Sequence, residues 1–207
     1  MEGQRTYSAG FATLEATAWL LGVLPFVVAA AIAALYVHDQ RVLAVIPEAL
    51  LREISLPTLS WTSNGSSAGE FRVEAASLRA AAGVLAENAL TEAKRSVLKT
   101  KALNARACLW VFQVDAQTGK AIAVEQEECG GSSLGELKTT LDGSLTSVLK
   151  RRVGVLVPER SNTVSFVDRA IIAGVVVSGS FIPMVPGIEQ PKLRFAHVTF
   201  PRSEVSL

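Results

Sequence analysis

The chain has 207 residues, of which 49% are apolar, and its 20 basic and 19 acidic side chains give a net charge of +1. This length allows one compact domain with an appendage or two small domains, and the near-neutral charge argues against nucleic-acid binding. With two Cys and two His, a metal centre would need carboxylate ligands as well. The mean hydropathy of +0.34 is high for a soluble protein and indicates one very apolar segment.

That apolar segment lies near the N-terminus, where the 22 residues from Ala16 to Val37 carry no charged side chain. As a helix rising about 1.5 Å per residue, it spans roughly 33 Å, enough to cross a bilayer core. Trp19 and Tyr36 lie near its two ends, where amphipathic rings favour the membrane interface. Three interpretations compete: a cleaved signal peptide, an uncleaved signal anchor, and the membrane helix of a processed precursor. The first is disfavoured because the apolar part of a signal peptide has about 7–15 residues.

A short motif precedes the segment: Gly10 is followed by Phe11 and, four residues later, by a single acidic residue, Glu15. This motif resembles the type IV prepilin processing site, specifically that of the TadE/TadF-like minor pilins (pseudopilins) of tight-adherence (Tad) systems. The resemblance implies that residues 1–10 are a leader and that a prepilin peptidase cuts between Gly10 and Phe11. Ala16 stands where major pilins of this class carry Tyr, which favours the minor class. The resemblance covers residues 1–40 and is only architectural beyond them.

Glu15 would be the fifth residue of the mature chain, and the resemblance implies a role in assembly. The new α-amino group of Phe11 has an ordinary pKa of about 7.7–8.0 and is cationic at neutral pH. Glu15 would then neutralise this amine, within one subunit or between neighbouring subunits. The alternative is that Glu15 only begins the helix, where the helix dipole favours a negative charge.

The function implied by the resemblance is that of a non-enzymatic minor pilin taking part in the assembly of a Tad-type pilus or secretion filament. Its partners would be the prepilin peptidase, other major and minor pilin subunits, the inner-membrane assembly platform and membrane lipid. The chain would cross the inner membrane once, with its C-terminal domain in the periplasm or carried into an extracellular pilus. Arg5 on one side and Arg41 and Arg52 on the other leave the positive-inside rule undecided, so the orientation rests on the motif.

The alternative function is a signal-anchored extracytoplasmic module that binds or transforms an unknown ligand. No phosphate-binding loop, dinucleotide-binding glycine pattern or metalloprotease motif is present in the sequence, and no Ser has a His and a carboxylate placed beside it. His38 lies beside the expected membrane segment and His197 in an expected strand, and a lone His in either place is usually structural. The sequence therefore predicts no catalytic residue, no metal and no cofactor.

The rest of the chain predicts an α+β protein. A transmembrane and stalk helix is expected over 11–56, interrupted near Pro47, then a linker over 57–69 and an extracytoplasmic head over 70–207 that combines helices with an antiparallel sheet. Ser60–Gly69 is the expected hinge. A second long helix is expected over Phe71–Ala107, because apolar residues recur there at steps of three and four. Its charges change from acidic to basic along the chain, which suits the helix dipole.

Two β-rich runs, Cys108–Asp115 and Lys120–Cys129, flank a Gly-containing turn and predict a hairpin. If the loop centres on Thr118 and Gly119, Cys108 faces Cys129 directly, within reach of a disulfide. Such a bond would fasten the hairpin to the end of the preceding helix. The alternative is a pair of buried free thiols.

A third amphipathic helix is expected from Leu134 to Leu149, followed by β-rich stretches at 153–157, 163–177 and 193–200. The charge-free run Ala170–Ile188 raises the alternative of a second membrane helix. Its glycines, prolines, Val and Ile favour a strand and a turn.

Overall fold

The computed structural model describes residues 5–53, 61–63, 71–114, 121–150, 168–183, 187 and 189–199. The elements in chain order are α1 (Arg5–Glu53), β1 (Trp61–Ser63), β2 (Phe71–Val73), α2 (Ala75–Ser96), β3 (Thr100–Val114), β4 (Ala121–Gly131), α3 (Gly135–Lys150), β5 (Asp168–Phe181) and β6 (Lys192–Thr199). The expected α+β composition is confirmed. Most of Ser60–Gly69 and all of the expected strand at 153–157 lie outside the described residues.

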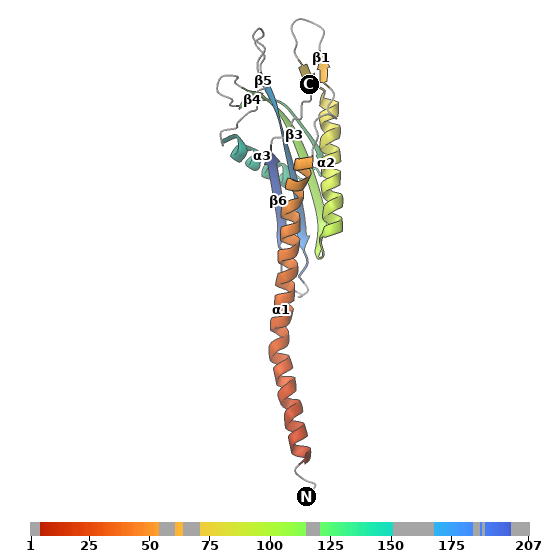
Figure 1. Ribbon diagram of the computed structural model, residues 1–207, viewed down its shortest axis with the longest axis vertical. Coiled ribbons are helices and arrows are strands. Elements are labelled where there is room, and N and C mark those ends of the chain that lie inside the picture. Colours follow the sequence, from red (N-terminus) through yellow and green to blue (C-terminus); the bar gives the residue numbers. More distant parts are fainter. Residues whose placement is uncertain are drawn as a thin grey trace.

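The centre of the fold is a four-stranded antiparallel sheet in the order β4-β3-β5-β6. Helices α1 and α2 cover one face, α3 covers the other, and α1 extends far beyond the sheet (Figure 1). We call the sheet, the helices α2 and α3, and the part of α1 that packs on them the head.

Strand β5 explains the second charge-free run. Val175 and Val177 face the core beneath α1 and α2, whereas Ile172 and Val176 face the core beneath α3. A central strand buried on both faces has no polar alternation, so it forms a continuous apolar run. The strand-and-turn interpretation of 170–188 is thus confirmed for β5, and among the described residues α1 alone is long and apolar enough to cross a membrane.

The expected second helix is wrong in its extent. Helix α2 ends at Ser96, and the chain enters β3 at Thr100, so residues 100–107 form a strand that pairs with β5. The expected interruption of α1 near Pro47 is also wrong, because the helix continues to Glu53 with Pro25 and Pro47 inside it. Proline removes one backbone donor from a helix, and at the buried Pro47 packing against the head holds the helix in register.

Helix α2 lies very close to the sheet because small residues line the contact. A Cβ atom added to Gly130 of β4 would lie 2.4 Å from the backbone nitrogen of Gly83 in α2. Next to it, Gly131 has a φ of +90°, a left-handed conformation that favours glycine. Any side chain at Gly130 would therefore push α2 away from the sheet.

Candidate functional site: the two halves of helix α1

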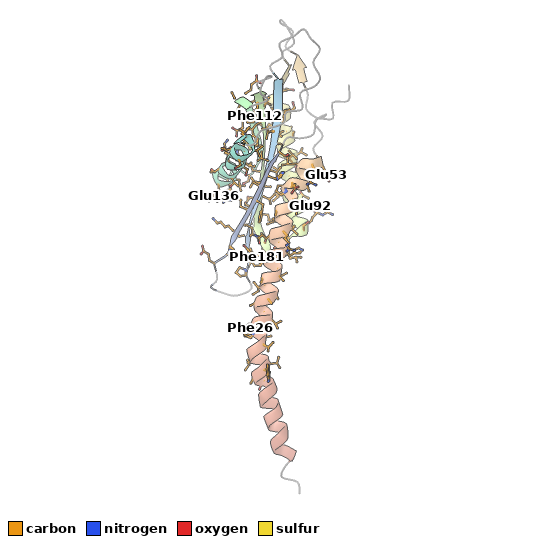
Figure 2. The ribbon with its side chains drawn as sticks, turned by 60° about the vertical axis from the view of Figure 1, so that its left-hand side comes forward. Phe26, Glu53, Glu92, Phe112, Glu136 and Phe181 are labelled. Carbon is orange, nitrogen blue, oxygen red and sulfur yellow. A yellow bond between two sulfur atoms is a disulfide. The ribbon has the colours of Figure 1, made fainter. Side chains whose placement is uncertain are left out.

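The first half of α1 stands free of the head. Every residue from Thr17 to Ala31 is exposed, including Trp19 at 68% and Phe26 at 75%. Figure 2 shows Phe26 on the part of α1 that projects beyond the sheet, well before the level of Phe181. This stretch, here called the free half, is apolar around its whole circumference, which suits a lipid environment or other apolar helices but not water.

The second half of α1 is built into the head. From Ile32 onwards its residues pack against α2, β5 and β6, and Leu43, Ile46 and Leu51 are buried. Tyr36 meets Phe181 of β5 edge to face, with ring centroids 5.2 Å apart. We call Ile32–Glu53 the packed half. The packed half and the rest of the head therefore share one hydrophobic core.

Asp39 ties the packed half to the connection between α2 and β3. Its side chain is fully buried. Its Oδ1 accepts a hydrogen bond from the backbone N–H of Leu98 at 2.8 Å, and its Oδ2 accepts from the N–H groups of Lys99 and Thr100 at 2.9 and 2.8 Å. The hydroxyl of Thr100 also donates to Oδ2, at 2.8 Å. One carboxylate thus satisfies three consecutive backbone donors where α2 gives way to β3.

The charge of Asp39 is stabilised by these donors. Burial acts to raise the pKa of this carboxyl, but the hydrogen bonds from Leu98, Lys99 and Thr100, with a further contact to His38, outweigh burial and hold the pKa below its ordinary value of 3.8. Asp39 lies beyond the charge-free segment, inside the head. The carboxylate is therefore ionised at neutral pH and acts as a structural latch.

A groove of about 760 Å³ runs between α1 and α2 on the outer side of the head. Apolar residues of the packed half line it, among them Val42, Val45 and Ile46. Glu53 and Glu92 lie together on this side of the sheet, whereas Glu136 of α3 lies on the other side (Figure 2). The lining also includes charged and polar side chains, and the hydroxyl of Ser96 donates a hydrogen bond to Glu92 at 3.0 Å.

The processing residues expected from the sequence lie on the first turns of α1. The backbone of Gly10, Phe11 and Glu15 is helical and continuous with the free half. Their side chains lie outside the described residues, so the expected contact between Glu15 and the amine of Phe11 stays a prediction.

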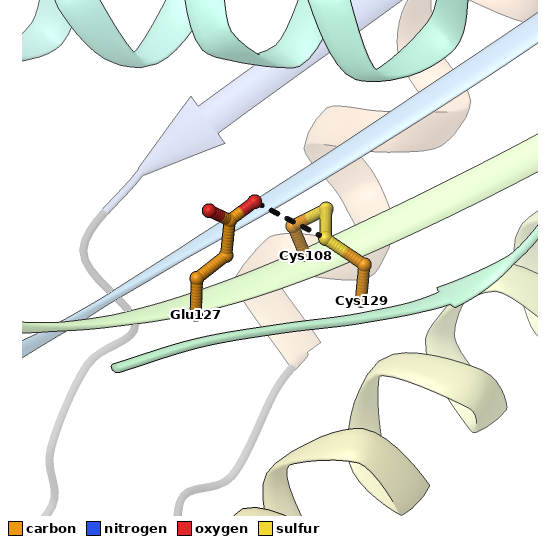
Figure 3. Close-up of side chains that lie close together, drawn as sticks. All are labelled: Cys108, Glu127 and Cys129. Carbon is orange, nitrogen blue, oxygen red and sulfur yellow. Dashed lines mark hydrogen bonds between the residues drawn. A yellow bond between two sulfur atoms is a disulfide. The ribbon is translucent and has the colours of Figure 1, made fainter. Parts of the chain in front are cut away.

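The expected disulfide between Cys108 and Cys129 is present, in the register predicted for the hairpin. Its expected position at the end of a helix is wrong, because Cys108 lies within β3 and is buried beneath α3. Figure 3 shows Glu127 beside the bond, with its Oε1 3.6 Å from the sulfur of Cys129. The same carboxylate also pairs with Lys138 of α3.

Cys108, Cys129 and Glu127 bring their potential ligand atoms within 4.8 Å of one another. The two sulfur atoms are bonded to each other, so neither is the thiolate that a metal ion requires. The group consequently joins β3 to β4 and forms no metal site in this state.

The sequence analysis did not single out Asp39. A signal was available, because Asp39 falls on the same helical stripe as Leu35, Leu43 and Ile46, at steps of three and four residues. An acidic residue on a buried stripe must find donors. The identity of those donors, 59 to 61 residues away, could not be inferred from the stripe.

Comparison with known proteins gave no match: no family model matches the chain, and no curated protein or solved structure is significantly similar to it. The function therefore has to be argued from the motif and the geometry.

Proposed function

We propose that this protein is a minor pilin subunit that is processed by a prepilin peptidase and takes part in assembling a Tad-type pilus or secretion filament. The observation that carries the proposal is the division of α1, one continuous helix whose first half is bare and apolar while its second half is part of the head core (Figure 1). A subunit of this shape can be anchored in a membrane by the free half. During assembly, the apolar helices of neighbouring subunits can replace the lipid around the free half.

The length of α1 between the proposed cleavage site and the head supports the proposed cleavage. Counted from Phe11, the helix reaches Ala31, the last residue before the head begins to pack, after 21 residues. At about 1.5 Å per residue this is roughly 32 Å, close to the thickness of a bilayer core. The proposed mature N-terminus would thus lie at one membrane surface and the head at the other, in the periplasm.

The test is the mass of the mature chain when the protein is made together with an active prepilin peptidase. We expect the wild-type chain to lose residues 1–10 and the Gly10→Val variant to keep them, because the protease needs a small residue before the cut. Gly22→Val is the matched control, since a Cβ at Gly22 meets no atom within 4 Å, and it should be processed like the wild type.

A wild-type chain that keeps Met1 while a known prepilin is cleaved in the same cells would contradict the proposal. A new N-terminus near Ala34 would instead indicate a cleaved signal peptide. If processing occurs as proposed, Glu15→Ala and the equally sized Glu15→Gln should both be cleaved and inserted but should associate poorly with other subunits. Normal association of both variants would exclude a role for Glu15 in assembly. The alternative that Glu15 only begins the helix is already wrong for the full-length chain, because α1 begins at Arg5 and has no acidic residue in its first turn.

A further inference from the structure

Basic side chains gather at the end of the head from which the free half emerges. Two come from the last turn of α2, two from the connection into β3 and its start, and one from the start of β6. We call them the basic collar: Lys94, Arg95, Lys99, Lys101 and Lys192. The chain order scatters them over almost a hundred residues, and the fold brings them to one end.

The strand register places two of these residues in one row. Lys101 of β3 is opposite Ser180 of β5, and Ser180 is opposite Lys192 of β6. Residues directly opposite one another on neighbouring strands share a face of the sheet. This row lies on the face that bears α3, whereas α2 brings its basic residues to the other face, so the collar surrounds the end of the sheet from both sides.

The collar has little acidic compensation. Within the part of the chain that the structure describes, none of its five side chains forms an ion pair. Glu92 lies less than one turn before Lys94 in α2, and Glu189 precedes Lys192 in the chain. With the buried, ionised Asp39, which accepts from the backbone of Lys99, these are three acids against five bases, and an excess of positive charge remains. By contrast, Arg79 of α2 and Lys138 of α3, away from this end, are paired with acidic residues.

The hydrogen bonds that Asp39 accepts fix the position of the collar along the axis of α1. It holds Leu98, Lys99 and Thr100 at the level of residue 39, eight residues beyond Ala31, where the free half ends. Eight residues of helix are about 12 Å, and the headgroup layer covers roughly 5–8 Å of this distance, so about 4–7 Å separate the level of residue 39 from the headgroups. If the free half crosses the membrane, the long basic side chains reach the headgroup layer and lie within one Debye length of its charge.

We propose that the basic collar binds the anionic headgroups of the membrane that the free half crosses. Leu98, which is 60% exposed, directly precedes Lys99 of the collar in the chain. The contact would seat the head against the bilayer before assembly and would weaken as salt rises. The inference rests on the membrane anchoring in the proposed function and does not depend on cleavage after Gly10.

The experiment measures how close Leu98 lies to lipid in the full-length protein. Leu98→Cys is labelled with a fluorophore, since the two native cysteines are bonded to each other, and the protein is placed in nanodiscs that contain lipid with a nitroxide on its headgroup. Nanodiscs of phosphatidylcholine alone are compared with nanodiscs in which about a third of the lipid is phosphatidylglycerol. We expect about twofold stronger quenching with phosphatidylglycerol, and a loss of this difference at about 0.5 M salt.

Charge reversal identifies the residues responsible. Lys94→Glu, Lys101→Glu and Lys192→Glu together should abolish the difference between the two lipids. The matched control reverses the same number of charges away from the collar, with Arg52→Glu, Arg79→Glu and Lys138→Glu, and should keep it. Surface ion pairs of this kind contribute little to stability, so the control should remain folded.

Equal quenching in both lipids, or a difference that survives reversal of the collar, would overturn the inference. Inorganic phosphate that abolishes the difference at constant ionic strength would also overturn it, by assigning the collar to a free anion. Flotation with vesicles separates the two proposals: a chain that fails to float contradicts membrane anchoring and hence the proposed function, whereas a chain that floats without the lipid difference contradicts the collar alone.

Discussion

The free half and the packed half of α1 belong to one unbroken helix, yet they differ in burial and in the distribution of polar side chains around the helix. From Thr17 to Ala31 the helix is apolar on all sides, and every residue is exposed. From Ile32 to Glu53 it has a buried stripe, and Arg41, Arg52 and Glu53 point outward. Hydrophobicity alone therefore does not locate a membrane-spanning segment in α1, because both halves are rich in apolar residues. What distinguishes them is the presence of a polar face.

The largest effect should come from removing the Asp39 latch, which joins the packed half to the head. Asp39→Ala leaves the N–H groups of Leu98, Lys99 and Thr100 without their acceptor, and an unsatisfied buried donor costs about 1–3 kcal/mol. We expect a loss of about 4 kcal/mol in the free energy of unfolding, measured by urea denaturation of the detergent-solubilised protein. Asp39→Asn, which keeps one acceptor oxygen, should lose about half as much. A loss below about 1 kcal/mol in Asp39→Ala would mean that these donors find other acceptors.

A charge placed in each half tests the difference between the halves directly. Val23 in the free half and Val45 in the packed half are 46% and 59% exposed. Val23→Arg should make the free energy of membrane insertion less favourable by about 3 kcal/mol, the cost of an arginine near the centre of a bilayer. Val45→Arg should leave insertion unchanged, because this position lies on the outside of the head. The measurement is the fraction of protein that resists carbonate extraction. Equal effects of the two substitutions would remove the distinction between the halves.

The smallest effect is the pH dependence of the Asp39 latch. A carboxyl whose pKa is lowered by folding contributes stability above its ordinary value of 3.8, and this contribution is lost as the pH falls through the lower value of the folded state. The difference in unfolding free energy between the wild type and Asp39→Asn should therefore be constant near neutral pH and shrink below about pH 4. Other carboxyls are common to both proteins and cancel. A difference that persists unchanged into strong acid would show that the charge of Asp39 is not what holds the connection.

The sequence predicted the parts of the fold that depend on local patterns. Helix α3, the hairpin of β3 and β4, and the pairing of Cys108 with Cys129 follow from periodicity and turn geometry. The register shifts after Val111 and after Gln113 were not predicted. Such bulges add single residues to one strand, and no pattern in this hairpin marks where they occur.

The end of α2 could not be predicted, because the residues that follow it are themselves good helix formers. Ala, Leu, Lys and Arg dominate residues 98–107, and neither Gly nor Pro interrupts them. The chain leaves the helix because Asp39 captures the donors of Leu98 to Thr100 and because β5 offers a partner along the whole of β3. Both causes are tertiary and lie far away in the sequence, so local propensity was overridden.

For the candidate site, the processing motif and the apolar segment were predicted from the sequence. The division of α1 into a free half and a packed half, and the hydrogen bonds of Asp39, were found only in the structure. Gly10, Phe11 and Glu15 remain predictions, since they concern a cleavage and an assembly step rather than a packing arrangement. The basic collar was out of reach of sequence reasoning, because Lys192 joins the others only through the order of the strands.

Because α1 is continuous, it also fixes the direction in which the head faces about the helix axis, relative to the first turns of the helix. Each residue of an α-helix advances the axis by about 1.5 Å and turns it by about 100°. Because no break separates the free half from the packed half, inserting one residue near Ala31 would rotate the whole head by more than a quarter of a turn relative to the first turns of α1. Inserting seven would return it almost to its starting direction, about 10 Å further from the first turns of α1. The number of residues in α1 before Ile32 therefore determines the direction in which the head faces about the helix axis.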